Sequence, residues 1–132
     1  MATPRYSSVL RATVLLIVSC FVSFPAHAKY NGGMGEPDDP FQIATAEDLM
    51  LLGDSPEDYG KHFILTADID LDPNLPGRKV FIRAVIAPNM DDTELWFRGI
   101  PFHGVFDGNN HTVSHLVIEG GNFLGLFGLL ES

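Results

Sequence analysis

Apolar residues follow three successive patterns along the chain. Ala12–Phe24 is almost wholly apolar, and Phe41–Leu71 carries short segments with helical or alternating spacing. From Val80 onward, short apolar segments recur roughly every ten residues between turns rich in glycine and asparagine. This order predicts an export segment, a short mixed region and a series of β-strands.

The first pattern has the features of a cleavable signal peptide. Two basic residues, Arg5 and Arg11, precede the apolar run, and the small residues Ala26 and Ala28 follow it. The run is short of the roughly 20 residues that span a bilayer. We therefore expect residues 1–28 to be removed after Ala28, which places the protein outside the cytoplasm, secreted, extracellular or at the cell surface.

A lipid anchor is an alternative for the same segment. Ile17-Val18-Ser19-Cys20 fits a lipoprotein cleavage box, with Cys20 as the lipidated residue. Phe21–Ala28 remains apolar, whereas lipoproteins usually begin with a polar tether. Cleavage after Ala28 leaves no cysteine in the mature chain, so disulfides would not contribute to its stability.

The mature chain is expected to begin with a flexible entry segment, residues 29–40, that is rich in glycine, proline and aspartate. Thr45 and Asp48 form a capping-box pattern ahead of a predicted helix, Ala46–Leu52, which ends at Gly53. The remaining expected elements are strands: Phe41–Ile43, His62–Leu71, Val80–Ile86, Phe102–Phe106, Thr112–Ile118 and Phe123–Leu129.

Short strands at regular spacing indicate an all-β sandwich, a barrel or a coiled solenoid. The Gly- and Asn-rich turns and the glycines within Phe123–Leu129 favour the solenoid, because its tight corners need residues that tolerate positive φ. The sequence stops just after this apolar run, so we expect a solenoid that is cut short.

Several motifs in a fixed order resemble a known family. These are Gly35–Ile43 (GEPDDPFQI), Thr45–Leu49 (TAEDL), Lys61–Phe63 (KHF), Ala67–Leu71 (ADIDL), Phe102–Val113 (FHGVFDGNNHTV) and Gly125–Gly128 (GLFG). Together they are similar to the N-terminal part of bacterial secreted right-handed parallel β-helix proteins with GLUG-type repeats, which have a pectin-lyase-like fold. The resemblance implies that residues 41–132 form a capping helix and the first coils of a β-helix.

The charge balance excludes some partners. The chain has a formal net charge of −9, and residues beyond 28 contain six basic and 17 acidic residues, a balance of −11. Such a chain is not expected to bind nucleic acid or an anionic membrane surface. The acidic surface serves solubility, or binds divalent cations.

Three carboxylates alternate along one predicted strand face. Asp68, Asp70 and Asp72 are candidate ligands for calcium, a hard cation that prefers oxygen. The alternative is that they keep an exposed strand edge from pairing with other chains. His111 and His115 have the spacing of a zinc pair on a helix, but this segment is predicted to be a strand, so we interpret them, with His103, as surface histidines.

No catalytic motif is recognisable. A pectate-lyase-like site would need a basic residue opposite calcium-binding aspartates, and nothing in the spacing places one there; the candidates are Arg78, Lys79, Arg83 and Arg98. Trp96 is expected to be buried or to cap the fold, with sugar stacking as the alternative. The sequence thus predicts an exported, non-catalytic scaffold or adhesion module that binds polysaccharide or cell-surface components. A fragment of a polysaccharide lyase or hydrolase is the alternative.

Overall fold

The computed structural model describes residues 28–132. The export segment, with Cys20 and Ala26, lies outside the described residues. Of the predicted cleavage residues, Ala28 is described and is exposed.

Helix α1 (Ala46–Gly53) begins where the capping box predicts. The Thr45 side chain accepts a hydrogen bond from the Asp48 backbone N–H at 3.1 Å, and the Asp48 carboxylate accepts one from the Thr45 N–H at 3.1 Å. A 3₁₀ turn follows at Pro56–Asp58, with the proline at its start. The predicted helix is therefore confirmed, one residue longer at its end.

Within residues 28–132, five short strands form two parallel sheets. The larger sheet has the order β1 (Phe41–Ile43), β2 (His62–Leu65) and β4 (Val105–Asp107). The smaller sheet pairs β3 (Ile69–Asp70) with β5 (Val113–Ser114).

The register of the larger sheet stacks three phenylalanines. Phe41 lies opposite Phe63, which lies opposite Phe106. Their rings pack side by side with centroids 5.5 and 6.5 Å apart, within the range of favourable aromatic pairs. This ladder attaches the late segment 105–107 to the early part of the chain.

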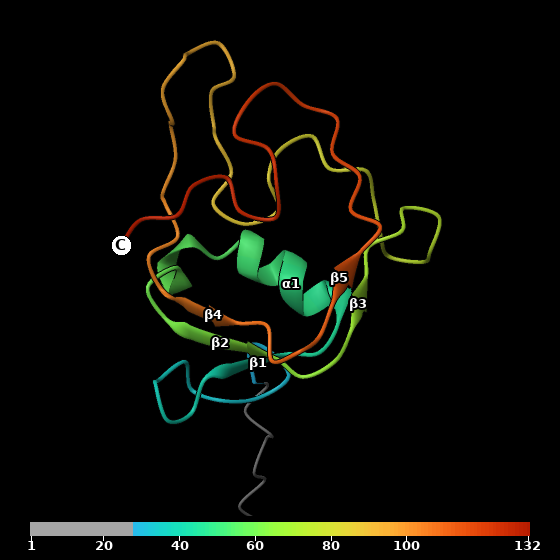
Figure 1. Cartoon of the computed structure of the whole chain (residues 1–132), viewed down its shortest axis with the longest axis vertical. Coiled ribbons are helices and arrows are strands. Elements are labelled where there is room, and N and C mark those ends of the chain that lie inside the picture. The colour runs from blue at the N-terminus through green and yellow to red at the C-terminus, as the bar shows by residue number, and fades with distance from the viewer. Residues whose placement is uncertain (1–27) are drawn as a thin grey trace, which may run out of the picture.

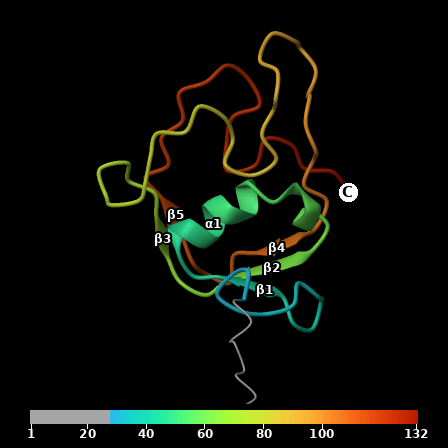
Figure 2. The ribbon, with the colours of Figure 1, turned by 180° about the vertical axis from the view of Figure 1, so that it is seen from behind.

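The core lies between the larger sheet and α1. Figures 1 and 2 show α1 above this sheet, with the irregular segments after residue 72 on the other side of the helix. Leu49 and Leu52 of α1 are fully buried, as are Ile43, Leu71 and Ile86. The helix is thus covered on both sides.

The prediction of a right-handed parallel β-helix is wrong. The described chain has one α-helix and strands of two to four residues in two small sheets, not a stack of coils. Beyond β3, the predicted strand Val80–Ile86 is reduced to single bridges, Phe81 to Ile118 and Ile86 to Phe127. Ala87, directly after Ile86, takes a positive φ of 51°, which is incompatible with a longer strand there.

Other predicted strands are also shorter than expected. His62–Leu71 divides at Thr66–Asp68, because β2 and β3 pair in different sheets. Thr112–Ile118 retains Val113–Ser114, and His115 then takes a positive φ of 54°, which is incompatible with a continuing strand. Within residues 28–132, no helix is long and apolar enough to cross a membrane.

Candidate functional site

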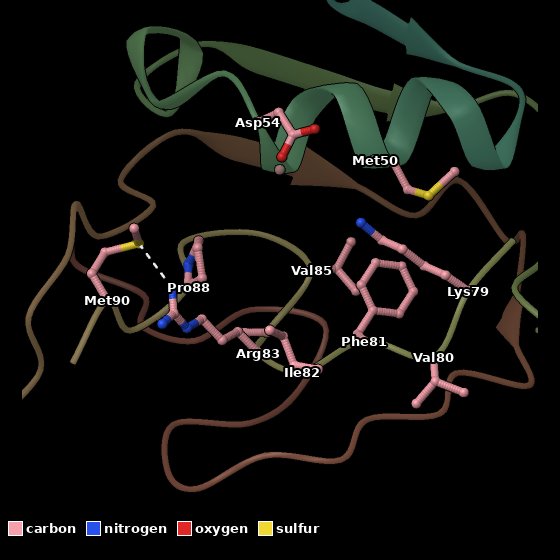
Figure 3. A pocket seen from close by; sticks show the side chains of 12 residues that line it. Met50, Asp54, Lys79, Val80, Phe81, Ile82, Arg83, Val85, Pro88 and Met90 are labelled. Carbon is pink, nitrogen blue, oxygen red and sulfur yellow. Dashed lines mark hydrogen bonds between the residues drawn. The ribbon is translucent and has the colours of Figure 1, made fainter. Parts of the chain in front are cut away.

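A cleft opens between the C-terminal half of α1 and the segment 79–90 (Figure 3). Its volume is about 450 Å³, within the range of ligand-binding pockets. We call it the basic cleft; its lining includes Met50, Gly53 and Asp54 on the helix side and Lys79–Val85, Pro88 and Met90 on the other.

Local packing fixes the separation of the two walls. Gly53 ends α1 directly against Val85, and a side chain at this glycine would collide with the Val85 carbonyl oxygen. The buried Tyr59 hydroxyl donates a hydrogen bond to the Gly53 carbonyl at 2.6 Å and accepts one from the Ala87 N–H at 3.0 Å. Burial raises the pKa of Tyr59, so the phenol stays neutral and keeps both bonds.

Two cations without ion pairs face this cleft. Within residues 28–132, Lys29, Lys61 and Arg78 form salt bridges with carboxylates. Lys79 and Arg83 line the cleft and form none with any carboxylate of that part of the chain. In a chain so rich in acidic residues, this concentration of free positive charge marks a site for an anion.

The Lys79 ammonium lies over the aromatic ring of Phe81. Its ammonium lies 5.3 Å from the centre of the Phe81 ring, a cation–π contact. Phe81 is buried, whereas Lys79 is exposed, and in Figure 3 the ammonium end points toward α1. The charge is thus placed inside the mouth of the cleft.

Arg83 is the least satisfied polar group of the described chain. Its Nε is buried without a hydrogen-bond partner among residues 28–132. Its Nη1 contacts only the sulfur of Met90, at 3.9 Å, and a thioether is a weak acceptor. A buried donor without a partner costs about 1–3 kcal/mol. The two terminal nitrogens of the guanidinium, rather than the buried Nε, are the pair that can donate two parallel hydrogen bonds to an anion.

Two carboxylates shape the field around these cations. Asp54 lines the cleft at the end of α1. Asp91 follows the cleft residue Met90 in the chain, and its pKa is lowered first by hydrogen bonds from Thr93 and then by the charges of Arg98 and Arg83. Arg83 is therefore balanced only at a distance, since no carboxylate of the described chain lies within salt-bridge range of it.

The predicted calcium ligands lie elsewhere and have other partners. Asp68 accepts hydrogen bonds from the Thr112 N–H at 3.0 Å and pairs with His111 at 3.1 Å. Asp70 accepts from the Asp72 N–H at 2.9 Å and pairs with His115 at 2.8 Å.

Asp72 itself accepts hydrogen bonds from Asn74, both from its backbone N–H and from its side-chain amide. The three carboxylates therefore hold the β3–β5 pair and the turn after it. Among residues 28–132, no three histidine, cysteine, aspartate or glutamate side chains gather closely enough to hold a metal ion. Calcium binding at Asp68, Asp70 and Asp72 stays a prediction.

The surface histidines are placed near these aspartates rather than near one another. His111 and His115 each direct Nδ1 to a different carboxylate, while His103 Nδ1 contacts the Pro101 carbonyl at 3.3 Å. The hydrogen bond with Asp70 raises the pKa of His115 above 6.5. These histidines connect neighbouring segments instead of forming one cluster.

Trp96 lies on the loop 88–100 and is 65% exposed. The expectation that it is buried is therefore wrong, whereas a stacking role is compatible with its exposure. The neighbouring Phe97 packs edge-on against Phe123, with centroids 5.4 Å apart. This second aromatic pair fixes the base of the loop.

Sequence reasoning missed the basic cleft because nothing in the spacing showed that α1 packs opposite residues 79–90. The available signal was compositional. Three of the six basic residues beyond position 28 fall within six positions, at Arg78, Lys79 and Arg83. The structure pairs Arg78 with Glu47 and leaves the other two facing the cleft.

Comparison with known proteins gives one likeness of note. The chain is 33% identical to Halomucin of Haloquadratum walsbyi over 104 residues, which cover 76% of this chain and 1% of Halomucin. The chain thus corresponds to about one hundredth of the length of that relative. No family model matches the chain, and no solved structure matches it, so the comparisons do not support the predicted β-helix.

Proposed function

We propose that the protein is a non-catalytic module that acts outside the cell or at its surface and binds acidic polysaccharide in the basic cleft. The ligand group is the carboxylate or sulfate of one sugar residue. Arg83 receives it through its guanidinium edge, and Lys79 adds a second charge from the mouth of the cleft.

The observation that carries this proposal is the unpartnered Arg83 in an open cleft. Three other cations of the described chain, Lys29, Lys61 and Arg78, are neutralised at short range, for example Lys61 with Glu36 at 3.1 Å. Arg83 instead has a buried Nε without a partner and a sulfur as its nearest acceptor. An external anion would give this guanidinium the charged partner that residues 28–132 do not supply.

Two further observations support the location and the type of ligand. The likeness to Halomucin, together with the signal-peptide pattern at residues 1–28, supports an extracellular or cell-surface protein. The exposed Trp96 offers an accessible aromatic face, on which a sugar ring can stack.

Binding to polysaccharides of matched size and different charge tests the proposal. We expect the chain to bind polygalacturonate and not dextran, with an affinity that falls as salt is raised, because screening weakens charge pairing. Arg83→Gln should weaken binding to polygalacturonate by about tenfold or more.

Arg98→Gln is the matched control, since Arg98, like Arg83, forms no salt bridge within residues 28–132, but it is exposed and does not line the cleft. Equal binding to dextran, or an equal loss in the two variants, would contradict the proposal. Release of unsaturated uronate from polygalacturonate would show instead that the protein is a lyase.

A further inference from the structure

The basic cleft adjoins a second, apolar cleft, and Asp54 lines both. This apolar cleft has a volume of about 330 Å³ and shares Gly53, Asp54, Pro88 and Met90 with the basic cleft. Its other lining residues are Pro56, Tyr59, Gly99 and Ile100. The two clefts therefore form one groove with a charged end and an apolar end.

The two ends differ sharply in chemistry. Apart from Asp54, the apolar cleft has no charged side chain in its lining, and the Tyr59 hydroxyl is already used by Gly53 and Ala87. Met90 and Ile100 at its rim are 59% and 52% exposed. Exposed apolar side chains around a concave, uncharged site favour a ligand group that brings its own apolar surface.

Asp54 stands at the junction of the two ends. A carboxylate there repels the acidic group of a ligand and accepts hydrogen bonds from neutral hydroxyls. An acidic sugar held here would therefore turn its charge toward Arg83 and its hydroxyls toward Asp54, and its next substituent would enter the apolar cleft.

We infer that the groove selects acidic polysaccharides in which sugar hydroxyls carry acetyl groups. The acetyl methyl occupies the apolar cleft against Met90 and Ile100 while the acidic group occupies the basic cleft. This inference rests on the proposed function, because it takes the basic cleft to hold the acid group. The two clefts share four lining residues. A ligand held in the basic cleft therefore also reaches the apolar cleft.

The test compares O-acetylated alginate with the same alginate after removal of its acetyl groups, in the presence of EDTA so that calcium does not gel either polymer. The purified chain should bind the acetylated polymer about fourfold or more tightly, the factor expected for burying one methyl group. Ile100→Ser should abolish this preference and leave the affinity for the deacetylated polymer unchanged.

Two variants separate the inference from the proposed function. Leu130→Ser is the matched control for Ile100→Ser, because Leu130 is 63% exposed and does not line either cleft. Arg83→Gln should weaken binding to both polymers and preserve their ratio. Equal binding of the two polymers by the unmodified chain would overturn the inference alone, whereas binding to neither would overturn the proposed function as well.

Discussion

The two halves of the described chain differ in how completely their side chains are covered. Nearly all buried residues lie between Tyr30 and Ala87, whereas residues 88–132 contribute only Asn89 and Phe102. The first half therefore has a closed core, and the second half is a layer that is buried on one side only. The basic cleft lies at their boundary, where a rigid helix meets a less covered segment.

The two halves therefore differ in what they contribute: the first supplies most of the folding stability, and the second supplies the groups suited to a ligand. Hydrophobic burial, which dominates folding free energy, is concentrated around α1 and the larger sheet. Exposed apolar groups and free cations, which suit a ligand surface, are concentrated after residue 79, with Ile82, Leu95 and Trp96 all more than 60% exposed. Variants in the two halves should accordingly have different consequences.

The largest effect is expected at the aromatic centre of the first half. Phe63 is 1% exposed and packs against Tyr30, Phe41, Phe102 and Phe106. Phe63→Ala should lower the free energy of unfolding by about 3–5 kcal/mol, because it leaves a cavity in the core. Urea denaturation followed by far-ultraviolet circular dichroism measures this loss.

Phe97→Ala is the matched variant in the second half. Phe97 is partly exposed and has one aromatic neighbour, Phe123, so we expect a loss of about 1 kcal/mol. If both variants lose the same free energy, the contrast between the halves is wrong.

Asn89 is the one buried polar residue of the second half, and we expect the next largest effect there. Its side-chain amide donates to the Asp91 carbonyl at 2.7 Å and to the Asn122 side chain at 2.6 Å, and its oxygen accepts from the Arg98 N–H at 2.6 Å. Asn89→Ala should cost about 2–3 kcal/mol, since it leaves buried groups without partners.

Because Asn89 lies between Pro88 and Met90, Asn89→Ala should also weaken polygalacturonate binding. Asn74→Ala serves as the control, because the Asn74 amide contacts only the exposed Asp72 carboxylate. A stable Asn89→Ala variant with unchanged binding would show that the loop does not position the cleft.

Tyr59→Phe tests the contact between the two halves, because the Tyr59 hydroxyl bonds both Gly53 and Ala87. The variant keeps the ring but leaves the fully buried Ala87 N–H without its acceptor. We expect a loss of about 1–2 kcal/mol and faster amide exchange at Ala87. If the Ala87 amide exchanges as slowly in Tyr59→Phe as in the unmodified chain, the Tyr59 hydroxyl does not hold α1 against the opposite wall of the cleft.

The smallest effect concerns pH and the β3–β5 pair. The pKa of His115 is raised by its hydrogen bond with Asp70, so its contribution to stability is complete below about pH 6.5 and is lost as pH rises through the raised value. The pKa of Asp70 is lowered, first by the Asp72 N–H, so its contribution is lost only as pH falls through a value below 3.8.

Thermal unfolding should therefore show slightly greater stability at pH 5 than at pH 8. His115→Gln should remove this difference, and His103→Gln, whose ring contacts a carbonyl and no carboxylate, should retain it. The same slope in both variants would exclude His115 as its source.

Local elements were predictable because their determinants are local. The capping box of Thr45 and Asp48 and the terminating Gly53 fixed α1 to within one residue. The architecture was not predictable in this way. A run of alternating residues such as His62–Leu71 specifies which faces are apolar, but it does not say that β2 and β3 join different sheets.

The same limit applies to the cleft. The excess of basic residues near position 80 is visible in the sequence, but which of them is neutralised depends on long-range packing. Arg78 meets Glu47 from α1, 31 positions away, and Arg83 meets only the Met90 sulfur. Residue types and spacing contain no information that distinguishes these two arginines.

The central claim is that the boundary between the two halves binds an acidic sugar. A titration of the ¹⁵N-labelled chain with trigalacturonate, followed by amide chemical shifts, tests it most directly. We predict that the shifts concentrate at Asp54 and at residues 79–90, while those of β1 and β2 stay unchanged. Shifts that gather instead at Asp68 and His111, or no shifts at saturating trigalacturonate, would contradict the claim.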